Sequence, residues 1–516
     1  MFVTLAVILA LPFILEAFVK IGFTRPRVSR HALFYILTPT TAVLVYASIA
    51  TLLGHAYITF AGWLMVYVGL TAVSNVKNRV LGEPLVSPDL ETARHLFIYP
   101  EFYIDYVGAG RVILVFGGFA LAVVASNIFE HSFASQQTLM PGWAAWALWL
   151  VTWCALLWAC AHLISRVFTQ EKARAFGMTF DINTDVARFG LFPLMLLYAL
   201  LLLDRTENPE LKQKRKPLQV PENAPDIIAV QAESYFDVNR LYQCIPGDES
   251  HAWAPLEALR AAGAQTGTLD VPAWGASTMQ SEFSFLTGTD NAKLGIDSIN
   301  PYQRAAYSGV ETIASRLRDE GYHTVCIHPA KKEFFRRSTV IPKLGFDAFI
   351  GIEAFDGAER FGPYVADTAL ATVIERTIAD HKANSDKPLF LFTITIESHG
   401  PWDSGRLAEW IDEEAATDVD PTGDRSFALF RQHMDHVLAL FSRLGPEANL
   451  PDNRPRVMGL YGDHLPAFHE LFTRHGFDGR EVDYILWRSD DPAPTVGPTR
   501  VGALGDTLLT TAGLQN

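Results

Sequence analysis

The amino-terminal part of the chain contains long apolar runs, and these constrain the fold more than any other feature of the sequence. A helix needs roughly 20 apolar residues to cross the hydrocarbon core of a bilayer. Segments that reach or approach this length lie at about 1–19, 33–53, 56–76, 111–129, 142–165 and 188–204. We therefore predict an α-helical transmembrane domain over residues 1–206, with about six spans.

Basic residues between these runs predict how the domain is oriented. The prediction rests on Lys20, Arg25, Arg27 and Arg30 in the first connection, and on Arg166, Lys172 and Arg174 in the last. The connections at 54–55 and 130–141 contain no Lys or Arg. Because basic loops stay on the cytoplasmic side, we expect the amino terminus and everything after residue 204 to lie outside the cytoplasm.

Residues 207–222 mark a change in composition. The segment contains Pro209, Pro217 and Pro221, which is typical of a linker. It also carries four basic residues, at 212 and 214–216, which would be solvated or would contact lipid headgroups on the outer leaflet.

Residues 223–516 have the pattern of an α/β domain with a mostly parallel sheet, because short apolar runs alternate with helical patterns. We predict strands at 226–231, 323–327, 388–396 and 456–461, and helices at 277–287, 309–320, 364–382 and 425–444. The net charge of −14 argues against nucleic acid as a partner.

Polar residues follow each of the predicted strands. In chain order they are Glu233 and Ser234, then His328, then Glu397, Ser398 and His399, and finally Asp463 and His464. Ligands of open α/β sheets bind beyond the carboxyl ends of the strands. We therefore expect these side chains to form one site, although each of them alone would more often be a turn or surface residue.

The segment 272–288 brings two hydroxyls, Ser277 and Thr278, to the first turn of a predicted helix. Backbone N–H groups and the positive end of the helix dipole suit a phosphate-like anion there, and either hydroxyl could attack a bound phosphoryl group. Such a hydroxyl becomes nucleophilic when a divalent cation binds its oxygen. Glu233, Asp463 and His464, together with Thr278, would bind one such cation. We favour Mn²⁺, with Mg²⁺ or Zn²⁺ as alternatives.

The segment 328–337, His-Pro-Ala-Lys-Lys-Glu-Phe-Phe-Arg-Arg, follows a predicted strand and is rich in positive charge. Positive charge beside the anion site would neutralise the non-bridging oxygens of a phosphoryl group. The alternative is a solvated basic loop without a functional role.

Five motifs in this order resemble those of the lipoteichoic acid synthase and phosphoglycerol transferase family, membrane-anchored members of the sulfatase/alkaline-phosphatase-like superfamily. They are Glu-Ser at 233–234, Ser-Thr-Met-Gln-Ser-Glu-Phe at 277–283, the stretch 328–337 with 341–347, Glu-Ser-His-Gly-Pro at 397–401 and Tyr-Gly-Asp-His at 461–464. The resemblance implies a sulfatase-like fold for residues 223–516. It also implies a bacterial plasma-membrane location, with this domain on the extracytoplasmic side.

The resemblance also implies an activity. Thr278, rather than Ser277, would take a glycerophosphate group from a phosphatidylglycerol-like donor, and the acceptor would be an envelope glycan or glycolipid. Substrate contacts would come from His328, Arg337 and His399. Phe335 stands where lipoteichoic acid synthases have tryptophan, which leaves the head group open.

Two alternatives remain at this point. One is a phosphodiesterase or other sulfatase-like hydrolase of phosphorylated envelope substrates, in which water takes the place of the acceptor. The other is a catalytically silent membrane sensor that keeps the fold. All four predicted metal positions hold competent ligands, which argues against the sensor.

Overall fold

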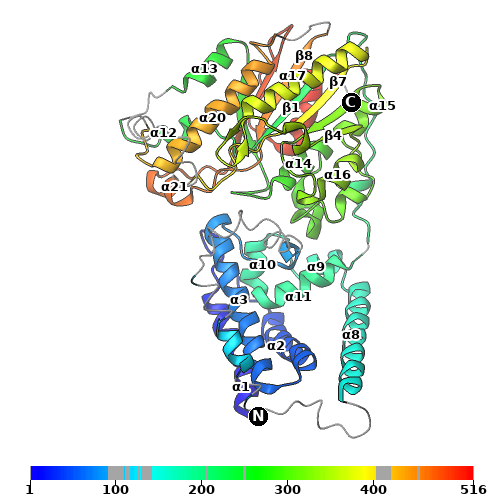
Figure 1. Cartoon of the computed structure of the whole chain (residues 1–516), viewed down its shortest axis with the longest axis vertical. Coiled ribbons are helices and arrows are strands. Elements are labelled where there is room, and N and C mark those ends of the chain that lie inside the picture. The colour runs from blue at the N-terminus through cyan, green and yellow to red at the C-terminus, as the bar shows by residue number, and fades with distance from the viewer. Residues whose placement is uncertain are drawn as a thin grey trace. The chain divides into compact units, whose positions relative to one another are not determined.

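The computed structural model describes residues 2–90, 110, 117–124, 128, 142–204, 206–247, 252–402, 420–449 and 454–514 (Figure 1). The chain divides into two compact units, Met1–Thr206 and Glu207–Asn516. Each unit has its own hydrophobic interior, and they are described separately below.

The first unit is helical throughout its described part. Its helices are α1 (Phe2–Phe18), α2 (Ala32–Leu53), α3 (Ala56–Leu81), the 3₁₀ helix η1 (Ser87–Asp89), α8 (Gly142–Val167), α9 (Gln170–Ala175), α10 (Ile182–Phe189) and α11 (Leu191–Leu202). Among the described residues, three helices are long and apolar enough to cross a membrane, namely α2, α3 and α8. These three confirm the spans predicted at 33–53, 56–76 and 142–165.

The other predicted spans fare differently. Helix α1 is apolar but shorter, and the span predicted at 111–129 lies largely outside the described residues. The segment predicted at 188–204 contains α11, which meets α10 at a bend of 119°, so the two helices together form either one broken span or a re-entrant loop. The bend occurs at Gly190, where φ is 86° and where a Cβ would lie 2.8 Å from the ring of Phe34. Glu16 stabilises the start of α11 by accepting a hydrogen bond from the backbone N–H of Phe192, at 3.0 Å.

The second unit is built on an eight-stranded sheet with the order β10-β2-β9-β8-β1-β7-β3-β4. Its strands are β1 (Asp226–Ala232), β2 (Gln265–Asp270), β3 (His323–Ile327), β4 (Ala348–Ile350), β7 (Leu389–Ile394), β8 (Arg456–Gly462), β9 (Val482–Arg488) and β10 (Thr499–Arg500). Only β9 runs antiparallel to its neighbours, so the sheet is mostly parallel, as predicted. A separate hairpin pairs β5 (Arg360–Phe361) with β6 (Tyr364–Val365).

Helices cover the sheet and connect its strands. They are α12 (Asn239–Tyr242), α13 (Ala254–Ala261), α14 (Thr278–Thr287), α15 (Ile313–Asp319), α16 (Arg337–Lys343), α17 (Asp367–Asn384), α20 (Arg425–Leu444), α21 (His469–His475) and α22 (Val501–Thr511). Short 3₁₀ helices lie at Pro209–Lys212, Asn291–Ser298, Ala305–Tyr307, Phe334–Arg336 and Ile352–Phe355. The strands predicted at 226–231, 323–327, 388–396 and 456–461 are confirmed as β1, β3, β7 and β8. The four predicted helices are confirmed as α14, α15, α17 and α20.

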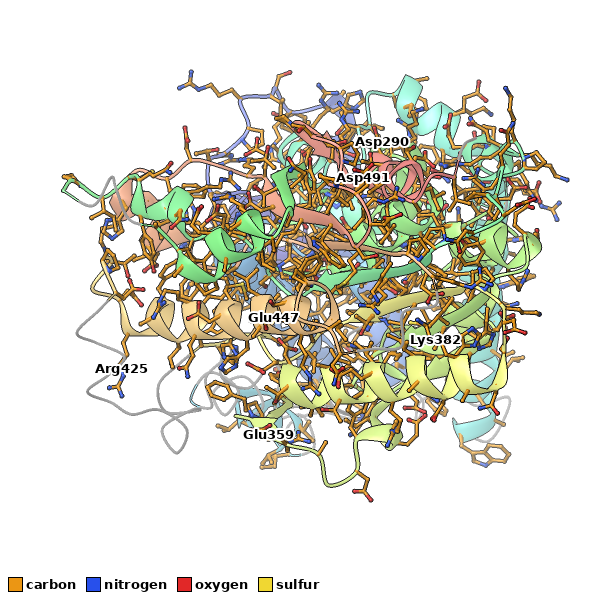
Figure 2. The ribbon with its side chains drawn as sticks, turned by 90° about the horizontal axis from the view of Figure 1, so that it is seen from above. Asp290, Glu359, Lys382, Arg425, Glu447 and Asp491 are labelled. Atoms are coloured by element: carbon orange, nitrogen blue, oxygen red, sulfur yellow. The ribbon has the colours of Figure 1, made fainter. Side chains whose placement is uncertain are left out.

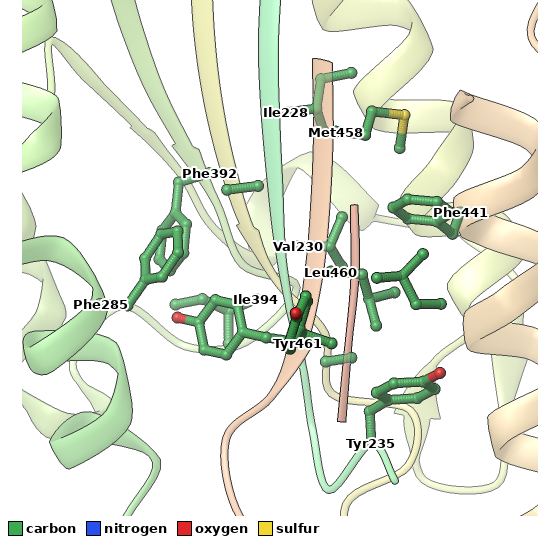
Figure 3. Close-up of a cluster of buried hydrophobic side chains, with 14 of the residues drawn as sticks. Ile228, Val230, Tyr235, Phe285, Phe392, Ile394, Phe441, Met458, Leu460 and Tyr461 are labelled. Atoms are coloured by element: carbon green, nitrogen blue, oxygen red, sulfur yellow. The ribbon is translucent and has the colours of Figure 1, made fainter. Parts of the chain in front are cut away.

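The core lies on both faces of the central strands, which explains why these strands are continuous apolar runs (Figure 3). On one face Phe285 of α14 stacks on Phe392 of β7 and Tyr461 of β8, with ring centroids 5.8 and 4.6 Å apart. On the other face Val230 and Leu460 point toward Phe441 of α20. These contacts fix α14, whose first turn forms part of the site, against the sheet.

The segment 207–222 packs against the second unit rather than lying free in solvent. Leu211 and Leu218 are buried in its core. Arg215 donates hydrogen bonds to Asp506 of α22, at 2.6 Å, and to the carbonyl oxygen of Thr287, at 2.9 Å. The prediction that the basic residues here are simply solvated is therefore wrong for Arg215, whose charge is paired with an acid of the sheet-covering helices.

Candidate active site

The site begins where β1 and β8 end. These parallel strands pair in register, with Ala232 opposite Gly462, so the next residues, Glu233 and Asp463, lie side by side. Position 462 has to be glycine, because a Cβ there would lie 2.0 Å from the backbone oxygen of Tyr235. The close approach of these two backbone segments brings the two carboxylates together.

Glu233, Asp463 and His464 form a buried group that could hold a metal ion. Each offers one ligand atom, and these atoms lie within 4.8 Å of one another. His464 donates from Nδ1 to the carbonyl oxygen of Leu465, at 3.0 Å. Its Nε2 therefore faces the carboxylates, 3.3 Å from Glu233 Oε1 and 3.5 Å from Asp463 Oδ2. A backbone partner that fixes one ring nitrogen is what orients the other toward a metal.

The electrostatics of this group favour a cation. Burial, and then the neighbouring charge of Glu233, raise the pKa of Asp463 to about 6. Burial alone would lower the pKa of His464, but the two carboxylates raise it to about 9. Asp463 Oδ2 is buried and makes no hydrogen bond with any residue that the structure describes. Two carboxylates, an imidazole and an unpartnered buried oxygen fit a divalent cation, although they do not identify it.

Thr278 lies against this group at the first residue of α14. Burial raises the pKa of the Asp463 carboxyl, and the nearby Thr278 side chain lowers it slightly, so the two side chains lie close together. Ser281, one turn further along the helix, donates to the carbonyl oxygen of Asp463 at 2.5 Å. The preceding Ser277 has a positive φ of 71° and its side chain makes no capping hydrogen bond. The first turn of α14 thus presents a hydroxyl beside the metal ligands without a side-chain cap, which suits an anion.

His328 directly follows β3, and Arg337 begins α16. Both are buried, and Arg337 Nη1 lies 3.2 Å from His328 Nε2. Burial and the charge of Arg337 lower the pKa of His328, while Glu233 raises it, so His328 lies near the metal group. The guanidinium of Arg337 lies 5.3 Å from the centre of the Phe335 ring, and Phe335 has a positive φ of 51°.

His399 lies in the loop that follows β7. It lies near enough to Glu233 and His328 to affect the pKa of each. Its Nδ1 lies 2.8 Å from the carbonyl oxygen of Gly400 and 3.3 Å from the hydroxyl of Tyr364 on β6. The structure therefore brings together the four expected metal positions, His328, Arg337 and His399. Phe335 lies next to these residues because its ring packs against the guanidinium of Arg337.

Two pairings of polar residues were not predicted, although Glu397 itself was among the strand-following residues expected in the site. Glu282 and Tyr302 form one of them, in which the Tyr302 hydroxyl donates to the Glu282 carboxylate. The second is Glu397 with His433 and His436, whose Nδ1 atoms lie 2.9 and 2.7 Å from Glu397 Oε1. An acid inside an otherwise apolar helix was the sequence signal for Glu282. The His-x-x-His spacing in α20 was the signal for the other set.

Comparison with known proteins gives a family match to the second unit. The model of the family described as Sulfatase matches residues 225–514. The capsular polysaccharide biosynthesis protein RkpI of Rhizobium meliloti is 25% identical over 483 residues, which cover 90% of this chain and 83% of that protein. Lipoteichoic acid synthase 1 of Bacillus subtilis is 26% identical over 177 residues, which cover 34% of this chain and 26% of that protein.

A solved structure extends the likeness to the whole chain. The integral membrane protein lipooligosaccharide phosphoethanolamine transferase A of Neisseria meningitidis is 13% identical, with a TM-score of 0.53. The match covers 100% of this chain and 95% of that one. It shows a shared fold, in which an α/β domain follows amino-terminal helices.

Proposed function

The chain belongs to the sulfatase family, and from that premise we propose that it is a membrane-anchored, metal-dependent phosphotransferase. In this proposal it moves phosphoglycerol, or a related phospho-head-group, from a phospholipid to an envelope glycan or glycolipid. The single observation that carries the proposal is the placement of Thr278, which lies beside Asp463 of the buried metal group at an uncapped helix start.

The reaction would proceed in two displacements. Thr278 Oγ1 attacks the phosphorus, an O–P bond forms, and the bond from phosphorus to the diacylglycerol oxygen breaks. The proton that leaves Thr278 ends on that oxygen. A hydroxyl of the acceptor then attacks the same phosphorus, and the bond from phosphorus to Thr278 Oγ1 breaks. The proton of the acceptor hydroxyl ends on Oγ1, so that Thr278 is regenerated. The product is a phosphodiester of the acceptor.

The residues of the site have distinct parts in this scheme. Glu233, Asp463, His464 and Thr278 would hold one divalent cation, which supplies the positive charge that makes the threonine hydroxyl more acidic. Asp463 lies beside that hydroxyl and would bind the same cation. The exposed backbone N–H groups at the start of α14 favour the anionic phosphoryl oxygens.

The membrane-length helices support a lipid donor over a soluble one. A phospholipid stays in the bilayer, so an enzyme that uses it gains from being held at the same surface. The names of the similar proteins also support an envelope glycan or glycolipid as acceptor, since they mention capsular polysaccharide, lipoteichoic acid and lipooligosaccharide. By the positive-inside rule, the second unit would face outward.

Intact-mass analysis of the full-length chain with phosphatidylglycerol and Mn²⁺ tests the proposal. We expect a glycerophosphate adduct on the parent and on Ser277→Ala, and none on Thr278→Ala. Release of diacylglycerol without any adduct, and without transfer to a glycan, would instead support the hydrolase. An adduct that persists in Thr278→Ala would contradict the assigned nucleophile.

A further inference from the structure

A buried series of hydrogen bonds connects β7 to the helix that carries Thr278. His328 Nδ1 lies 2.9 Å from the carbonyl oxygen of Ile394, and Arg337 Nη1 lies 3.2 Å from His328 Nε2. Arg337 Nη2 then donates to Glu282 Oε2 at 2.7 Å. The hydroxyl of Tyr302 donates to the other oxygen of Glu282. The series thus ends on α14, one helical turn after the nucleophile.

The chemistry of these groups assigns every proton in the series. A carbonyl oxygen can only accept, so His328 carries its hydrogen on Nδ1. An arginine can only donate, so His328 Nε2 is the acceptor. Burial, and then the charge of Arg337, lower the pKa of His328 to about 3, which agrees with a neutral ring. Both nitrogens of His328 are therefore occupied, and its direct role is to hold Arg337.

Glu282 has an unusual position for an acid beside a phosphate site. Its side chain is fully buried, and that of Arg337 is 2% exposed. A carboxylate paired with Arg337 cancels part of the charge that a phosphoryl group would meet. If the arginine served only as a positive charge, this pairing would weaken it. A buried pair does, however, fix the guanidinium in one place, because each partner left alone would be an uncompensated charge.

We propose that Glu282 is a positioning residue for the phosphoryl group, and this inference rests on the proposed function. Glu282 and Thr278 lie four residues apart and therefore share a face of α14. By holding Arg337, Glu282 sets the distance between the guanidinium and the attacking hydroxyl. Arg337 Nε is buried and makes no hydrogen bond within the described part of the chain, so it is a donor left for a substrate oxygen.

A double-mutant cycle on the full-length chain tests this assignment. The variants are Glu282→Gln, Arg337→Gln and the combination, with kcat and KM measured by release of diacylglycerol. We expect each single variant to lose about 10- to 100-fold in kcat/KM, the usual cost of losing a residue that orients a ligand-binding side chain. The combination should lose no more than Arg337→Gln alone, because Glu282 acts through Arg337.

Asp226→Asn is the matched control. It also removes the charge of one partner in a buried ion pair, since Asp226 Oδ2 lies 3.2 Å from Nζ of Lys382, and both side chains are less than 10% exposed. Asp226 begins β1, at the end of the strand opposite Glu233, and Lys382 lies on the yellow α17 (Figure 2). This variant should lower the melting temperature and leave kcat/KM unchanged.

The outcomes separate the inference from the function on which it rests. Glu282→Gln that melts earlier yet keeps the parental kcat/KM, or losses that simply add in the double variant, would overturn the inference. If Glu282→Gln does not fold, Tyr302→Phe removes one hydrogen bond to the same carboxylate, and unchanged kinetics there would overturn it equally. A parent that releases no diacylglycerol refutes the donor instead. In that case the test of the positioning role is the affinity of Glu282→Gln and the parent for inorganic phosphate, measured by thermal shift. Equal affinities would count against a positioning role.

Discussion

Gly462→Ala should disable the metal group without changing any of its ligands. The new Cβ would lie 2.0 Å from the carbonyl oxygen of Tyr235 and 3.1 Å from Cβ of Val482. Ordinary contacts of a Cβ begin near 3.4 Å, so the end of β8 and the Tyr235 backbone must separate by more than 1 Å. Neither the Tyr235 backbone nor the buried sheet beside it can yield easily, because both are part of a closely packed core.

The size of the effect follows from that displacement. Asp463 is the next residue, so it moves with the strand and its position relative to Glu233 changes. A misplacement of about 1 Å in a reacting group costs about 100-fold in rate. Overpacking of the strand should add about 1–3 kcal/mol of destabilisation. Gly459→Ala is the matched control in the same strand, because its Cβ would meet only the side-chain ends of Leu508 and Leu486, at 3.1 and 3.4 Å.

The assay is a Mn²⁺ titration of the full-length chain followed by thermal unfolding, with turnover measured on the same samples. Binding to the native state raises stability by RT ln(1 + [L]/Kd), so a weakened site appears as a smaller rise in melting temperature. We expect the rise to disappear in Gly462→Ala and to persist in Gly459→Ala. Parental Mn²⁺ affinity and turnover in Gly462→Ala would refute the argument that this backbone contact sets the carboxylate spacing.

Three further predictions concern the metal, the pH dependence and the topology. Chelation should abolish activity and Mn²⁺ or Mg²⁺ should restore it, whereas activity indifferent to chelators would rule out the metal group. Burial would raise the pKa of Glu397, but hydrogen bonds from His433 and His436 lower it to about 2, and Glu397 in turn raises the pKa of His436. This pair should therefore stabilise the fold between pH 4.5 and 6.5, with the gain lost as pH falls from 4.5 toward 2 and as it rises through the folded pKa of His436 above 6.5. Below pH 4.5 and above pH 6.5, the melting temperature should vary less with pH in His436→Gln than in the parent. An identical pH profile in the two proteins would contradict the pairing. A reporter enzyme fused to the carboxyl terminus should be active outside the cytoplasm, and cytoplasmic activity would reverse the proposed topology.

The central part of the fold could be predicted from the sequence because parallel, doubly covered strands are continuous apolar runs. Strands β1, β3, β7 and β8 are of this kind, and they form the middle of the sheet. Strand β2, Gln-Thr-Gly-Thr-Leu-Asp, was missed because it is half-buried and mostly polar. The sharp bend at Gly190 was not predicted because it depends on the backbone conformation of one glycine, just before the apolar helix Leu191–Leu202.

In the candidate site, too, some features could be predicted from the sequence and others could not. Glu233, Asp463 and His464 could be predicted because each directly follows an apolar strand, and strand ends meet at one edge of the sheet. The pairing of Glu282 with Arg337 could not, because it joins residues 55 positions apart through the packing of α14 against the loop after β3. Sequence spacing sets a helix face, but it does not state which distant side chain that face will meet.

The register of β1 against β8 also determines when, during folding, the site can become reactive. Ser234 and Asp463, which hydrogen-bond across the two strand ends, are 229 positions apart in the chain. Closing so long a segment has an entropic cost that the sheet, rather than an ion, has to overcome. In a chain whose sheet has not yet formed, Thr278 is therefore no more reactive than any other threonine. In the proposed function the enzyme would cleave the lipids around it, and it becomes able to do so only once the sheet has formed.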